Sequence, residues 1–128
     1  MAQYEHLPIF RKMFDLTVYL EKAVRHFPRY HKYTLGSELR SMCHDGLGFI
    51  AEANSLAPME RRAVLLRLRL VLERIKIHLM LAREVQAFNR TKSFFHATGL
   101  IVDVSRQNEG WLRSVSAGGV RSRQRGRS

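Results

Sequence analysis

The chain has 128 residues and 45% hydrophobic content, which suits one compact domain with a real core and leaves no room for a catalytic domain beside a binding domain. Its 22 Lys and Arg residues face only 11 Asp and Glu, so the formal net charge is +11. A charge this high on a short chain favours a polyanionic partner, nucleic acid ahead of an acidic protein. The single cysteine, Cys43, excludes an intramolecular disulfide, and its apolar neighbours indicate a small buried side chain.

The N-terminal residues, among them Glu5 and His6, form no long apolar run, so we expect no signal peptide. No segment approaches the ~20 apolar residues of a membrane span. These features predict a cytoplasmic protein that has no membrane partner.

Apolar residues recur at spacings of three and four along four segments, and each segment predicts an amphipathic helix. The first begins at Pro8, because proline suits a first helical turn, and ends near His26, because the residue before Pro28 avoids helical geometry. The second begins near Thr34, a candidate N-cap, and ends near Leu56.

Two glycines, Gly46 and Gly48, lie inside the second predicted helix. Glycine is costly in a helix interior. We interpret both as marking a site where another helix approaches closely.

The third segment, from Pro58 to about Val85, is the strongest helix prediction in the chain. The fourth runs from about Thr91 to Val115, and Gly118–Gly119 is expected to end it. The third helix carries a heptad-like apolar stripe, formed by Leu65, Leu68, Leu72, Ile75, Leu79 and Ala82.

Short connections between helices of similar length predict an all-α, up-down-up-down four-helix bundle over residues 1–116. Residues 117–128 contain four arginines and no acidic or aromatic residue, so we expect a flexible, disordered basic tail there. The tail arginines are candidates for binding nucleic acid, and they are Arg121, Arg123, Arg125 and Arg127.

The third helix has a second apolar face, roughly opposite its heptad stripe. A helix of a small monomeric bundle needs only one such stripe, so the second suggests a surface that meets another subunit. The alternative is that the fourth helix and the tail cover it. With two aromatic residues of the first helix, the predicted interface comprises Leu66, Leu70, Ile77, Leu81, Phe10 and Phe14.

Basic residues run between these two faces of the third helix. Arg62, Arg69, Lys76 and Arg83 repeat at intervals of seven on one side, and Arg67 and Arg74 lie on the other side. We predict that these cations contact phosphates or acidic patches of a partner.

Basic and aromatic residues alternate in the turn at 25–33. Cations there can neutralise phosphates, and exposed tyrosines can stack on unpaired bases. The alternative is that Phe27 and Tyr33 only anchor the turn to the bundle. The candidate binding residues in the turn are Arg25, Arg29, Tyr30 and Lys32.

Motifs for catalysis or metal binding do not stand out. The six histidines lack tight metal-ligand spacing, the glycines form no phosphate-binding loop, and the acidic residues are scattered singly. We expect no catalytic residues, no metal and no cofactor.

Three stretches carry a resemblance to a known family. Residues 27–36 (FPRYHKYTLG) resemble the junction between the first two helices of the Avd-like four-helix bundle proteins. Residues 67–74 (RLRLVLER) and 109–112 (EGWL) are similar to that family's third helix and its late glycine-tryptophan signature. Avd is the accessory variability determinant of diversity-generating retroelements.

The resemblance implies a homopentamer that binds the retroelement's reverse transcriptase and its template RNA, and that supports mutagenic retrohoming without catalysing it. The 23S rRNA intervening-sequence proteins share the bundle and a similar Phe-Pro turn, so they are an alternative. A scaffold that binds only proteins is another. The high net charge and the Arg-rich tail favour the Avd-like proteins over the intervening-sequence proteins.

Overall fold

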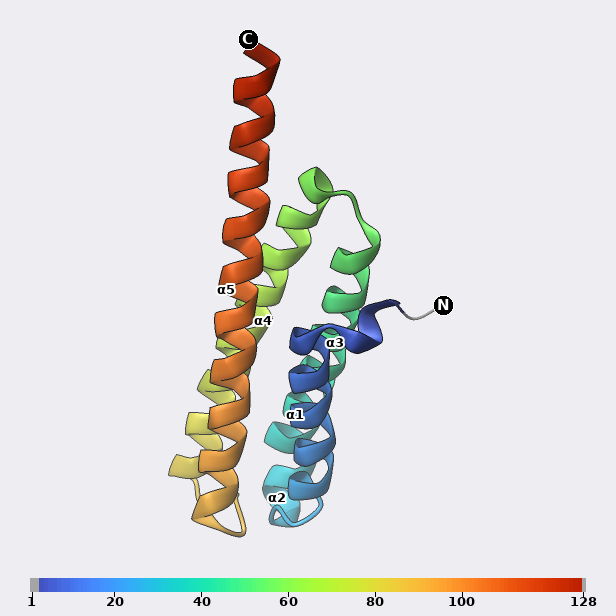
Figure 1. Cartoon of the computed structure of the whole chain (residues 1–128). Coiled ribbons are helices and arrows are strands. Elements are labelled where there is room, and N and C mark those ends of the chain that lie inside the picture. Colours follow the sequence, from blue (N-terminus) through green and yellow to red (C-terminus); the bar gives the residue numbers. More distant parts are fainter. Residues whose placement is uncertain (1–2, 128) are drawn as a thin grey trace.

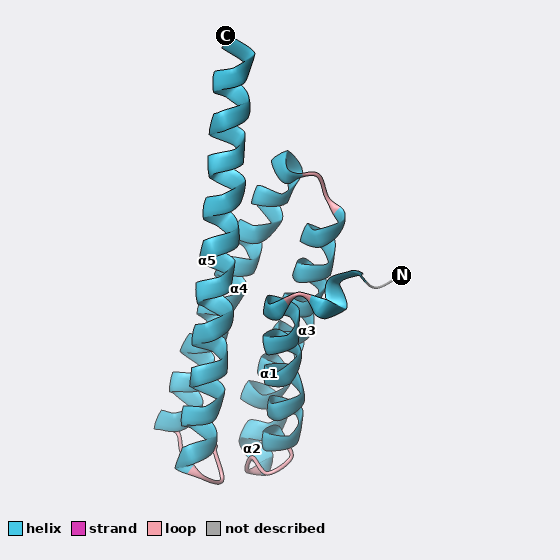
Figure 2. Ribbon diagram, in the orientation of Figure 1, coloured by secondary structure: helices cyan, strands magenta, loops and turns pink. Residues whose placement is uncertain are grey.

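The computed structural model describes the backbone of residues 3–127 and the side chains of residues 4–116. The described chain is helical and contains no strand (Figure 2). None of its helices is long and apolar enough to cross a membrane. The elements are η1 (Gln3–His6), α1 (Pro8–Val24), α2 (Arg29–His31), η2 (Lys32–Gly36), α3 (Ser37–Ser55), α4 (Pro58–Glu84) and α5 (Thr91–Arg127).

The long helices α1, α3, α4 and α5 alternate in direction along the bundle, as the sequence predicts (Figure 1). α4 packs against α3 and α5, and α1 packs against the same two helices. α1 and α4 therefore occupy opposite corners of the bundle, and each has an outer face that no other long helix covers.

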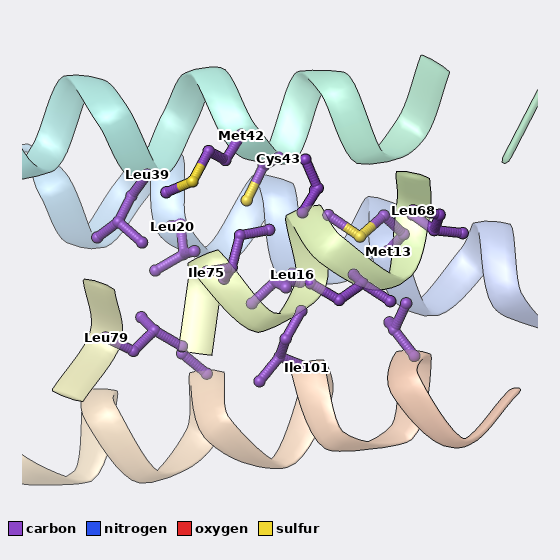
Figure 3. Packing of buried hydrophobic residues seen from close by; sticks show 14 of the residues in the cluster. Met13, Leu16, Leu20, Leu39, Met42, Cys43, Leu68, Ile75, Leu79 and Ile101 are labelled. Atoms are coloured by element: carbon purple, nitrogen blue, oxygen red, sulfur yellow. The ribbon is translucent and has the colours of Figure 1, made fainter. Parts of the chain in front are cut away.

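The core lies along the axis shared by the long helices (Figure 3). The predicted heptad stripe of α4 is confirmed, since Leu65, Leu68 and Ile75 are completely buried. Full burial of one such side chain stabilises the fold by about 1.5–3 kcal/mol, so the stripe is a major source of stability. The other helices contribute fully buried side chains that include Met13, Leu16, Leu20, Leu39, Ile50, Ile101 and Val104.

Proline begins α1 and α4 as predicted, because Pro8 and Pro58 lie in the first turns. The predicted start of the second helix at Thr34 is wrong. The helical backbone begins at Arg29, directly after Pro28, whose carbonyl accepts the N–H groups of His31 and Lys32 at 2.9 Å.

Thr34 consequently lies inside the helical segment and is not an N-cap. Its Oγ1 donates to the carbonyl of Tyr30, four residues earlier, at 3.2 Å. The segment from Lys32 to Gly36 is a π-helix, a widened turn that is usually inserted within an α-helix. Residues 29–33 of the predicted basic turn are therefore helical, so Arg29, Tyr30 and Lys32 lie on helical backbone.

The two glycines of α3 have different surroundings. A Cβ atom at Gly46 would lie 2.9 Å from Cε of Met13, so α1 does approach closely there, as predicted. Gly48 is exposed, and no atom would lie within 4 Å of its Cβ. The same interpretation is wrong for Gly48, because it lies two residues, or about 200°, further around the helix.

Helix α5 extends to Arg127 and passes Gly118 and Gly119, where we expected it to end. The prediction of a flexible tail is therefore not confirmed. The predicted binding residues of the tail lie outside the residues whose side chains are described, and they are Arg121, Arg123, Arg125 and Arg127.

α4 ends in two hydrogen bonds that close its last turn. The N–H of Gln86 donates to Arg83 O at 3.0 Å, and the N–H of Ala87 donates to Ala82 O at 2.8 Å. This pattern is the Schellman motif, and it places Gln86 at φ 59°. Glycine usually occupies this position, because a Cβ atom strains left-handed backbone.

We expect Gln86→Gly to raise the free energy of unfolding by about 0.5–1 kcal/mol. It removes about 1–2 kcal/mol of left-handed strain, and glycine's freedom in the unfolded chain offsets about 0.4–1 kcal/mol of that gain. Urea unfolding followed by circular dichroism measures the change. Gln107→Gly inside α5 is the control, where the same substitution should cost about 1 kcal/mol. A loss of stability at both positions would contradict the strain that we assign to the left-handed backbone of Gln86.

Candidate nucleic-acid interface

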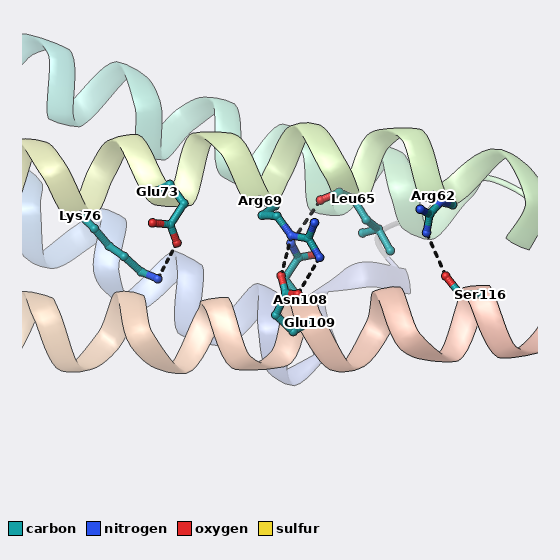
Figure 4. Close-up of polar contacts among 8 residues, drawn as sticks. All are labelled: Arg62, Leu65, Arg69, Glu73, Lys76, Asn108, Glu109 and Ser116. Atoms are coloured by element: carbon teal, nitrogen blue, oxygen red, sulfur yellow. Dashed lines mark hydrogen bonds and ion pairs between the residues drawn. The ribbon is translucent and has the colours of Figure 1, made fainter.

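The predicted basic ribbon of α4 lies along the seam with α5 (Figure 4). Arg69 forms a forked pair with Glu109, with Nε to Oε2 at 2.8 Å and Nη2 to Oε1 at 2.6 Å. The hydrogen bonds from Arg69 hold the pKa of the Glu109 carboxyl below its usual value, and the same bonds raise the pKa of Arg69. This pair connects α4 to α5.

The other members of the ribbon also have contacts inside the chain. Arg62 donates to Ser116 Oγ at 2.9 Å, and Lys76 donates to Glu73 at 2.9 Å. The guanidinium of Arg83 lies over two aromatic rings of α5, at 4.9 and 5.0 Å from the ring centroids. A phosphate would have to compete with these contacts. The role of the ribbon in binding a phosphate therefore stays a prediction. Cations elsewhere that lack such contacts are better placed to bind one.

Arg67 and Arg74, on the other side of α4, form no hydrogen bond or ion pair through their side chains with any described residue. They lie beside the predicted second apolar face, which the bundle leaves open. Leu70 and Ile77 on this face are 63% and 55% exposed. The described part of α5 therefore does not cover the face, and that alternative is excluded there. Leu66 and Leu81 are also exposed.

The aromatic residues predicted on the first helix lie at the opposite corner of the bundle, on α1. Phe14 is 49% exposed, whereas Phe10 is partly buried and packs against the core. The Phe10 ring lies 4.8 Å from that of Tyr4 and 6.1 Å from that of Phe14. The two predicted interface patches therefore lie on separate helices, at opposite corners of the bundle.

A separate group of cations gathers at the end of the bundle where the α1–α2 turn and the α4–α5 loop lie, at the bottom of Figure 1. None of them forms an ion pair with a carboxylate of the described residues. We call this group the basic tip, and its residues are Lys22, Arg25, Arg29, Lys32, Arg90 and Lys92.

Tyrosines accompany the basic tip. Tyr30 and Tyr33 are 81% and 68% exposed, and the ammonium group of Lys32 lies 5.8 Å from the centroid of the Tyr33 ring. The alternative that Tyr33 anchors the turn is therefore wrong. Phe27 does anchor it, since it is 4% exposed and its ring meets Phe88 edge-on at 5.1 Å.

The sequence prediction for this end was incomplete, because it included only the turn at 25–33. Lys22, Arg90 and Lys92 belong to the same surface but come from α1, the α4–α5 loop and α5. An antiparallel bundle brings alternate connections to one end. That rule, applied to the predicted helices, could have joined residues 90–92 to the turn.

The cysteine and two of the histidines in the described part of the chain are buried or hydrogen-bonded inside the bundle. No three His, Cys, Asp or Glu side chains there are placed to hold a metal ion. Cys43 is fully buried, and burial raises the pKa of its thiol to about 12, so it stays protonated. His78 and His44 are hydrogen-bonded to Glu38 and Glu21.

The fold and the site define an all-helical bundle with a basic, aromatic end and an outer apolar face. No family model matches the chain, and no curated protein matches its sequence.

Proposed function

We propose that the chain is a non-catalytic, cytoplasmic accessory protein of a diversity-generating retroelement, which binds template RNA and the reverse transcriptase. The observation that carries the RNA part is the basic tip, where six cations lack carboxylate partners and two tyrosine rings are exposed. Free cations release counterions from phosphates, and exposed rings stack on bases.

The outer face of α4 supports the protein part of the proposal. An exposed stripe of large apolar residues flanked by Arg67 and Arg74 suits a partner that is apolar at its centre and acidic at its rim. We propose that this face meets the reverse transcriptase or a second copy of the chain, and that the copies assemble into a homopentamer. Size-exclusion chromatography with light scattering measures the assembly, and a monomer at micromolar concentration would contradict it.

A scaffold that binds only proteins is the second candidate, and the exposed face of α4 favours it. The two candidates differ after nuclease treatment. If RNA binding contributes, nuclease should weaken the retention of the reverse transcriptase on the immobilised protein. If the chain is a protein scaffold, retention should be unchanged and RNA affinity should be low at physiological salt.

We expect Arg25→Gln with Arg29→Gln to weaken RNA binding and to lower its salt dependence. Each phosphate contact with a single strand contributes about −0.7 to the slope of log affinity against log salt, so the slope should become shallower by about 1.4. Fluorescence anisotropy with labelled RNA over a salt series measures the slope.

Arg106→Gln with Arg113→Gln is the matched control, because it removes two exposed cations from α5, away from the basic tip. The control should leave the slope nearly unchanged. If both double variants lose the same affinity, net charge rather than the basic tip determines binding. An RNA affinity that does not depend on salt would exclude the proposed role in RNA binding.

A further inference from the structure

A surface pocket of about 310 Å³ lies within the basic tip, between α1 and the α4–α5 loop. This volume is at the lower end of the range for small-ligand sites, about 300–1,000 Å³. The pocket combines cationic, aromatic and small polar side chains, and it is lined by Tyr19, Lys22, Ala23, His26, Phe88, Asn89, Arg90 and Ser93.

No carboxylate among the described side chains lines this pocket, which distinguishes it from other pockets on the bundle. The pocket on the α4–α5 seam includes Glu73 and Glu109, and the groove beside Phe10 includes Asp15. The pocket between α1, η2 and α3 includes Glu21. A carboxylate repels a phosphate, so the pocket at the basic tip is the best suited of these four to an anion.

Its two cations are available for such an anion. Lys22 on α1 and Arg90 in the α4–α5 loop are exposed, and neither forms a hydrogen bond or an ion pair through its side chain with a described residue. They approach the same pocket from two separate elements. A phosphate between them would be held from two sides, with the arginine able to donate two parallel hydrogen bonds.

The aromatic wall of the pocket is held in place by the bundle. Phe88 meets Phe27 edge-on at 5.1 Å and Phe94 at 6.1 Å, and the Tyr19 ring lies 4.4 Å from His96. Phe88 and Tyr19 are half-buried, so each still presents part of its ring. Rings that packing holds rigid lose little conformational entropy when a flat ligand binds.

We propose that this pocket holds one unpaired nucleotide of a bound RNA strand. The phosphate lies between Lys22 and Arg90, and the base lies against Phe88 and Tyr19, with Asn89 and Ser93 able to hydrogen-bond its edge. The inference rests on the proposed RNA binding and adds a preference for single strands. In a duplex, each base is already stacked and paired, so its face cannot enter the pocket.

The test compares two RNA probes by fluorescence anisotropy: labelled oligouridine, and the same strand annealed to oligoadenylate. We expect the single strand to bind at least about tenfold more tightly, a difference of about 1.4 kcal/mol. Lys22→Gln with Arg90→Gln should weaken single-strand binding by about tenfold and make its salt slope shallower by about 0.7, because the two cations share one phosphate. Arg106→Gln with Arg113→Gln removes the same charge elsewhere and should change the affinity less than about twofold.

A second measurement locates the ligand. Uridine monophosphate titrated into the intact chain should shift the amide NMR signals of Phe88, Asn89 and Ser93, and Lys22→Gln with Arg90→Gln should abolish these shifts. Equal affinity for single strand and duplex, or a pocket variant that behaves like the control, would overturn the nucleotide pocket while leaving RNA binding intact. If neither probe binds in a salt-dependent way, the proposed function and the pocket both fail.

Discussion

Leu72→Ala should lower the free energy of unfolding by about 3 kcal/mol, within the 2–5 kcal/mol typical of buried Leu→Ala substitutions. Leu72 is 1% exposed and belongs to the heptad stripe of α4. The substitution removes apolar contacts and leaves a cavity that the surrounding helices fill only in part. Urea unfolding followed by circular dichroism measures the change.

The matched control, Leu70→Ala, lies two residues away on the same helix. Leu70 is 63% exposed, so its truncation should cost less than about 0.5 kcal/mol in the monomer. If the outer face of α4 joins subunits, the cost of Leu70→Ala will grow with protein concentration, because association stabilises the folded state. Similar costs for the two variants in the monomer would contradict the two-faced structure of α4.

Gly36→Ala should destabilise the chain by up to about 2 kcal/mol, although alanine is the better helix former. The new Cβ atom would lie 2.5 Å from Cγ1 of Val24 and 3.5 Å from Cδ2 of Phe27. Val24 is 3% exposed and branched at Cβ, so it has few rotamers into which it could move. Overpacking of this kind costs about 1–3 kcal/mol, which exceeds the gain in helix propensity of about 1 kcal/mol.

Gly48→Ala is the control for this second prediction. No atom would lie within 4 Å of its Cβ, so only the gain in helix propensity should remain, up to about 1 kcal/mol. The thermal midpoint should fall for Gly36→Ala and rise for Gly48→Ala. A rise for both would mean that the contact between α1 and Gly36 of η2 opens at little cost.

The Gly36 contact also bears on the basic tip. Gly36 ends the π-helix, and its close approach to Val24 fixes how the turn that carries Arg29, Tyr30 and Lys32 lies against α1. A variant that opens this contact should therefore disturb the proposed RNA binding as well as stability. The exposed Gly48 on α3 offers no such connection.

The fold class and the core could be read from the sequence. The heptad stripe of α4, the proline starts of α1 and α4, and the second apolar face of α4 all follow from spacing within a single segment. A helix turns about 100° per residue, so the sequence alone defines which residues share a face. Hydrophobicity then indicates which face is buried. The buried face of α4 could therefore be predicted without knowing which helices pack against it.

Only the tertiary structure determines which residues of other helices each helix face contacts. The ribbon residue Arg69 pairs with Glu109, 40 residues away, and spacing within α4 gives no sign of that acceptor. The basic tip likewise joins Lys22, Arg25 and Arg90 from separate elements, and the roles of Gly46 and Gly48 depend on where α1 passes α3. Periodicity gives the angle of a residue around its own helix axis. Pairing and convergence depend on the relative positions of different helices, and these are set only when the helices pack.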